Sequence, residues 1–189
     1  AMAAYCANDM ERAARGFTEL IELSERLADD NTLRVGRAYL SLCQRRLHHF
    51  SAVRLQTQLL ADALQRGSPN PAYQGIVESN LGWLAYHRGK AAETARHAQA
   101  ALNAWRDAQN PYPMQWCALM LLFALSVEAR RLDQAMAWLR ALLAPPQQRL
   151  VTPVEAALTR LFESTQPSGR PSLAQLKRAL ASARAAGYV

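Results

Sequence analysis

A repeated pattern in this chain constrains its fold more than any other sequence feature. Five short segments begin with an apolar residue and end in a small or apolar one, and their last positions are Ala13, Val53, Thr94, Ala135 and Leu176. These positions are separated by 40, 41, 41 and 41 residues. In the first four segments, apolar or small residues follow four, seven and eight positions later, as in an amphipathic helix. A fixed period of this length indicates an array of stacked helix hairpins.

Capping and helix-breaking residues separate these segments from further helices of similar length. They are clustered at residues 29–32, 67–71, 110–113, 145–146, 152–153 and 164–171. Asp and Asn favour helix N-caps, and Pro is tolerated in a first helical turn but not in a helix interior. Because no strand pattern interrupts the array, we predict an all-α chain of about nine helices. These form antiparallel hairpins in a single helical-repeat domain over residues 1–189.

The third unit carries the residues of a known repeat. Asn80-Leu81-Gly82 precedes Gly89 at the inter-helix turn, and Ala101 lies near the end of the second helix. This unit resembles a tetratricopeptide repeat, although Thr94 stands where that family prefers Ala. The period of 40–41 residues also exceeds the family's usual length of about 34. In this respect the chain is similar to the repeat regions of bacterial signalling ATPases and maltose-regulator-like transcription activators.

The resemblance implies a right-handed superhelix of hairpins, with a concave face lined by the first helix of each pair. It also implies a non-catalytic protein-interaction or ligand-sensing domain of a bacterial signalling or transcription-regulatory protein. Its partner would be a peptide or a partner domain, including other domains of the same polypeptide. Tyr5 and Cys6 fit the end of a helix that lacks its beginning, so we expect this domain to be part of a longer polypeptide.

The charge of the chain is unevenly distributed. Its formal net charge is +7, but residues 1–30 hold seven acidic and three basic residues, which gives −4 there and +11 in the remainder. A basic remainder suits an acidic protein surface or a nucleic acid, so the alternative function is a nucleic-acid-binding helical-repeat protein. No stretch approaches the roughly 18 apolar residues of a membrane span, and we expect a cytoplasmic protein without a membrane partner.

Motifs for catalysis and cofactor binding are absent from the sequence. There is no phosphate-binding loop, dinucleotide fingerprint, His-Glu-x-x-His or Gly-x-Ser-x-Gly motif, so we expect neither an enzyme nor a cofactor. Cys6, Cys43 and Cys117 are widely spaced, which favours core packing over a disulfide or a metal site. His residues near predicted helix ends suit the helix dipole, and this interpretation is preferred over metal binding or acid–base chemistry.

Five residues are candidates for partner binding. Arg37, Asn80 and Gln115 lie on predicted first helices or their entrances, where a polar side chain should face solvent or a ligand. Arg45 and Arg46 belong to the densest basic cluster, which suits an anionic partner. The preferred alternative is that these bases neutralise carbonyl groups at a helix C-terminus. Aromatic residues on the same helices are expected mainly in the core.

Overall fold

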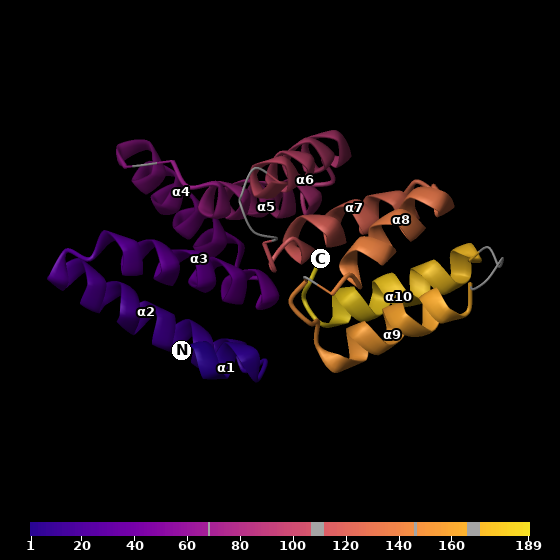
Figure 1. The fold of residues 1–189 in the computed structure, drawn as a ribbon, viewed down its shortest axis with the longest axis horizontal. Helices are drawn as coiled ribbons and strands as arrows, with labels where there is room; N and C mark the ends of the chain where they lie inside the picture. Colours follow the sequence, from indigo (N-terminus) through magenta and orange to yellow (C-terminus); the bar gives the residue numbers. More distant parts are fainter. Residues whose placement is uncertain (68, 107–111, 146, 166–170) are drawn as a thin grey trace.

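A computed structural model describes residues 1–67, 69–106, 112–145, 147–165 and 171–189 (Figure 1). These residues form ten α-helices and no strand, which confirms the all-α prediction. The helices are α1 (Met2–Cys6), α2 (Met10–Leu27), α3 (Asp30–Arg46), α4 (Phe50–Arg66), α5 (Pro71–Tyr86), α6 (Ala91–Arg106), α7 (Trp116–Glu128), α8 (Leu132–Leu142), α9 (Thr152–Glu163) and α10 (Leu173–Ala185). The short α1 is the addition to the nine expected helices, and it includes Tyr5 and Cys6.

Side-chain caps explain several helix starts. The Asp29 carboxylate accepts a hydrogen bond from the Thr32 backbone N–H at 3.0 Å, so it caps α3 as expected. Asn70 caps α5 in the same way, with Pro71 in the first turn. α7 begins at Trp116, later than the turn signal at residues 110–113 suggested. Ser68 and residues 110–111, 146 and 166–170, which also carried turn signals, lie outside the described residues.

Successive helices pack against one another along the chain, and contacts also link α3 with α5, α5 with α7, and α7 with α10. Figure 1 shows the helices following an arc from α1 and α2, past α5 and α6, to α9 and α10. The C-terminus lies toward the middle of this arc. This arrangement brings the last residues of the chain to the end of α3 and the beginning of α7.

The core is densest around α7, because nearly every residue of this helix is buried. Phe123, Met120 and Leu121 have no exposed surface. Gly82 of α5 allows close packing here, since a Cβ atom at this position would lie 3.2 Å from Leu121 Cδ1. None of the described helices combines the length and apolarity that crossing a bilayer requires.

Candidate functional site

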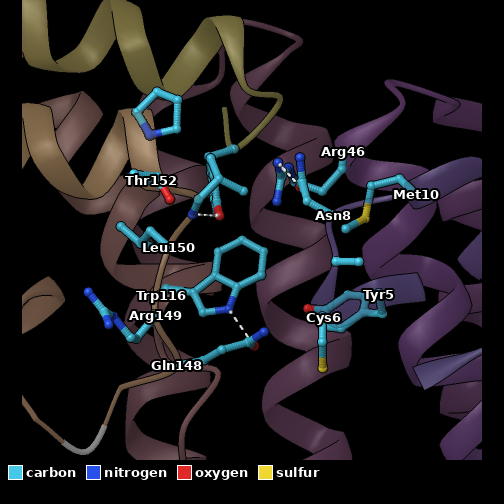
Figure 2. A pocket seen from close by; sticks show the side chains of 14 residues that line it. Tyr5, Cys6, Asn8, Met10, Arg46, Trp116, Gln148, Arg149, Leu150 and Thr152 are labelled. Carbon is cyan, nitrogen blue, oxygen red and sulfur yellow. Dashed lines mark hydrogen bonds between the residues drawn. The ribbon is translucent and has the colours of Figure 1, made fainter. Parts of the chain in front are cut away.

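A cavity of about 380 Å³ opens where segments that are distant in sequence meet. Its lining comes from residues 5–8, Met10, Arg46 at the end of α3, Trp116 at the beginning of α7, residues 148–153 and Tyr188. Figure 2 shows Trp116 between the 148–153 segment on one side and Arg46 and Tyr5 on the other. This volume lies within the range of about 300–1,000 Å³ that is typical of small-molecule sites. We call this cavity the central pocket.

Arg46 joins both ends of the described chain at this pocket. Its Nε donates a hydrogen bond to the carbonyl oxygen of Ala186 at 2.7 Å, immediately after α10. Its Nη2 donates to Asn8 Oδ1 at 2.9 Å, in the turn after α1. The cation therefore compensates a carbonyl at the negative end of α10, and it also fixes the α1–α2 turn.

Tyr188 closes another side of the pocket. Its hydroxyl oxygen accepts a hydrogen bond from the backbone N–H of Val151 at 3.0 Å, and its ring packs edge-on against Trp116, with centroids 4.9 Å apart. Burial raises the pKa of Tyr188 above its usual value of 10.0. Burial also raises the pKa of Tyr5 well above this value. Both phenols are therefore neutral near pH 7, where they serve as hydrogen-bonding and packing groups.

The described lining is cationic and aromatic. Arg46 and Arg149 are its charged residues, and no carboxylate or histidine lines the cavity within the described part of the chain. Arg149 lies at the rim, where its side chain is 88% exposed and pairs with Glu155 at 2.6 Å. The Arg46 guanidinium in this lining is suited to forming charge-assisted hydrogen bonds with an anion.

A buried arginine supports the wall behind Trp116. The Arg45 side chain is 1% exposed, and its Nη2 donates to the carbonyl oxygen of Cys117 at 3.1 Å. Its guanidinium carbon lies 5.8 Å from the ring centroids of both Trp83 and Trp116. Burial lowers the pKa of Arg45 below its usual value. No carboxylate among the described residues forms an ion pair with Arg45. A carbonyl dipole and two aromatic rings stabilise this cation instead.

The structure corrects the expected exposure of two candidate residues. Asn80 is completely buried and does not face solvent, because its amide donates to Ser41 Oγ at 2.9 Å while Oδ1 lies 3.4 Å from Arg45 Nη1. Arg45 is likewise part of the core rather than of an exposed basic patch. Helices α3, α5 and α7 pack side by side, so several of these polar groups bond to one another between them, although Arg45 Nε has no hydrogen-bond partner in the described part of the chain.

The other three candidates lie in different places. Arg46 lines the central pocket, whereas Gln115 is partly buried at the N-cap of α7, next to Trp116. Arg37, on the same helix as Arg46, does not line this pocket and pairs with Glu25 of α2 at 2.8 Å. The alternative interpretation of the basic cluster, contact with carbonyls at a helix C-terminus, fits Arg46 alone of its two candidate arginines, because the carbonyl that Arg45 binds lies in the first turn of α7. However, the carbonyl that Arg46 binds belongs to α10 rather than to its own helix.

Sequence reasoning missed the contributions of Tyr5, Tyr188 and residues 148–153 to this pocket, and it expected Trp116 in the core, where its side chain is indeed buried while lining the cavity. These residues converge only through tertiary packing, and the repeat pattern carries no signal for it. The expected burial of Cys43 and Cys117 is confirmed, while Cys6 is exposed. Within the described ranges, no group of three or more His, Cys, Asp or Glu side chains is arranged to hold a metal ion.

Comparison with protein-family models, with curated proteins and with solved structures finds no match to this chain.

Proposed function

We propose that this chain is a non-catalytic ligand-sensing domain of a bacterial signalling or transcription-regulatory protein. Its hairpins stack as a tetratricopeptide-like, right-handed superhelix, and its ligand is a small anionic molecule with an aromatic portion. The observation that carries the proposal is the central pocket, in which residues 5–8, Met10, Arg46, residues 148–153 and Tyr188 line one cavity.

The chemistry of the lining supports this ligand class. Arg46 uses Nε and Nη2 in hydrogen bonds within the described chain, and its Nη1 makes none there. A carboxylate placed against Nη1 would form a charge-assisted hydrogen bond in a site without a competing described carboxylate. Trp116 and Tyr188 also line the cavity and give it an aromatic wall, against which the edge of a flat group would pack.

Ligand sensing requires that the ligand bind one arrangement of the helices better than another. A ligand in the central pocket contacts the α1–α2 turn and the 148–153 segment at the same time. It would therefore stabilise the arrangement in which these two parts of the arc lie together. Neighbouring domains of a longer protein would sense this change through the ends of the array.

Benzoate is a suitable first probe, with benzylamine and benzyl alcohol as analogues of the same shape. We expect isothermal titration calorimetry to detect benzoate at concentrations up to about 10 mM and to show at least about tenfold weaker binding of the other two. Binding of all three with equal affinity would contradict the assigned ligand charge. An absence of heat with benzoate would contradict the proposed ligand class.

Variants of the protein locate the binding site. Arg46→Gln should weaken benzoate binding about tenfold or more, because it removes the cation of the pocket. Arg54→Gln is the matched control, since Arg54 is exposed on α4 and does not line the pocket. Equal benzoate affinity of the two variants would show that benzoate binds outside the central pocket. If Arg46→Gln fails to fold, the comparison of the three probes on the unmodified protein still tests the ligand class.

A further inference from the structure

A second cavity lies between the first turns of α3 and the last turns of α4, away from the central pocket. Its volume is about 90 Å³, and its polar lining consists of Asp30, Arg34, Arg37 and Arg66. Arg34 and Arg37 are three residues apart on α3, so they lie on the same helix face. Arg66 comes from the last turn of α4. Two helices therefore direct three guanidinium groups toward one small space.

Two of these arginines have unsatisfied hydrogen-bond donors. Arg34 Nε and Arg37 Nε are both buried from solvent and have no hydrogen-bond partner in the described part of the chain. Arg37 uses Nη2 to bind Glu25 at 2.8 Å, which leaves its Nε free for another acceptor. Buried donors are normally paired, so these two N–H groups are suited to an acceptor placed in the adjacent cavity.

The backbone at the end of α4 leaves space for Arg34. Gly67 follows α4 in an extended conformation, and a Cβ atom at this position would clash with Arg34 Nη2. The guanidinium of Arg34 is therefore seated against a residue without a side chain. Leu33, Leu59 and Ala63, each partly buried, complete the described wall and supply its apolar part.

We propose that this three-arginine cavity binds inorganic hydrogen phosphate. Guanidinium groups match tetrahedral oxyanions through paired N–H donors, and the small volume suits one such anion rather than a nucleotide. Asp30 distinguishes between oxyanions, because its carboxylate accepts a hydrogen bond from the hydroxyl group of hydrogen phosphate. Sulfate and the dianion of a phosphate monoester lack this hydroxyl group, and the carboxylate repels them.

Calorimetric titration of the full chain at constant ionic strength tests this site with three probes. We expect inorganic phosphate to bind, and sulfate and phenyl phosphate to bind at least about tenfold more weakly near neutral pH. Asp30→Asn should remove most of the preference for phosphate over sulfate. Stronger binding of phenyl phosphate than of inorganic phosphate would assign the site to a phosphoryl group of a larger molecule and would contradict the proposal.

Arginine variants separate binding from a structural role. Arg34→Gln and Arg66→Gln should each weaken phosphate binding about tenfold, whereas Arg54→Gln, which alters an exposed arginine of the same α4, should not. Arg66 is exposed, so its variant should fold even if Arg34→Gln does not. Unchanged phosphate affinity in Arg66→Gln, or no phosphate binding by the unmodified protein, would overturn the proposal.

Discussion

The guanidinium carbon of Arg46 lies 4.0 Å from the ring centroid of Tyr188, so the last residue of α3 contacts the residues that follow α10. The Arg46 side chain also donates a hydrogen bond to the Ala186 carbonyl oxygen. A cation over an aromatic ring and a charge-assisted hydrogen bond thus act together at one position. This pair closes the arc of helices and forms one wall of the central pocket.

Gly187 makes this contact sterically possible, and Gly187→Ala should destabilise the fold by about 2–4 kcal/mol. Its φ angle is +75°, which an alanine adopts only with strain, and an added Cβ atom would clash with the Arg46 carbonyl oxygen. Urea denaturation measures the change in the free energy of unfolding. Gly89→Ala is the control, because Gly89 has φ +71° with open space around it, and its cost should be about 1 kcal/mol. Equal costs would show that the Arg46 contact does not constrain residue 187.

The buried guanidinium of Arg45 predicts a large difference between two Arg-to-Lys substitutions. Arg45→Lys should lower the free energy of unfolding by about 2–3 kcal/mol, because an ammonium group loses the planar packing against Trp83 and Trp116. Arg54→Lys, at an exposed position, should change it by less than about 0.5 kcal/mol. Chemical denaturation of both variants gives the comparison. A loss below about 0.5 kcal/mol for Arg45→Lys would show that any buried cation suffices there.

His87 should make stability depend on pH in mildly acidic solution. Desolvation of its ring, with further contributions from His48, Arg45 and Arg184, lowers its pKa from 6.5 to about 4. Because the folded-state pKa is lower than the unfolded one, protonation favours the unfolded chain. The stabilising contribution is therefore complete above pH 6.5 and is lost as the pH falls toward 4.

The size of this effect should be about 1 kcal/mol or less, since His87 is partly exposed to solvent, which screens its charge. Urea denaturation at several pH values should show a smaller slope for His87→Gln than for the unmodified protein. His49→Gln, whose parent side chain is exposed and bonded to Gln44, should retain the original slope. Identical slopes in all three proteins would exclude His87 as the source.

Cysteine reactivity should separate Cys6 from the two buried cysteines. Burial raises the pKa of both Cys43 and Cys117 to about 12, whereas Cys6 is exposed. A disulfide reagent near pH 8 should therefore modify one thiol per folded chain, and all three after denaturation. Cys6→Ser should abolish the reaction of the folded protein. A reactive second thiol in the folded state would mean that the core around α3 and α7 opens readily.

The repeat period predicted the helices well, because amphipathic spacing and caps such as Asp29 are local properties of the sequence. The period did not predict that Asn80 and Arg45 are buried, because it does not show how many neighbouring helices surround α3 and α5. A signal for full burial was present in residues 116–128, which are almost entirely apolar and therefore suit a helix covered on all sides. The contact of Arg46 with Ala186 forms only when the end of α10 packs against the end of α3, and no local sequence pattern predicts this packing.

The most direct test of the central pocket uses the indole N–H signals of the four tryptophans in a nitrogen-15 NMR titration with benzoate. Trp116 lines the pocket, and its Nε1 lies 3.4 Å from Gln148 Oε1, so a ligand beside this ring should shift its signal. The signals of Trp83, Trp105 and Trp138, which do not line the pocket, should move much less. A saturable shift of Trp116 that disappears in Arg46→Gln is the predicted result. A shift confined to another tryptophan, or none at any, would contradict ligand binding in the central pocket.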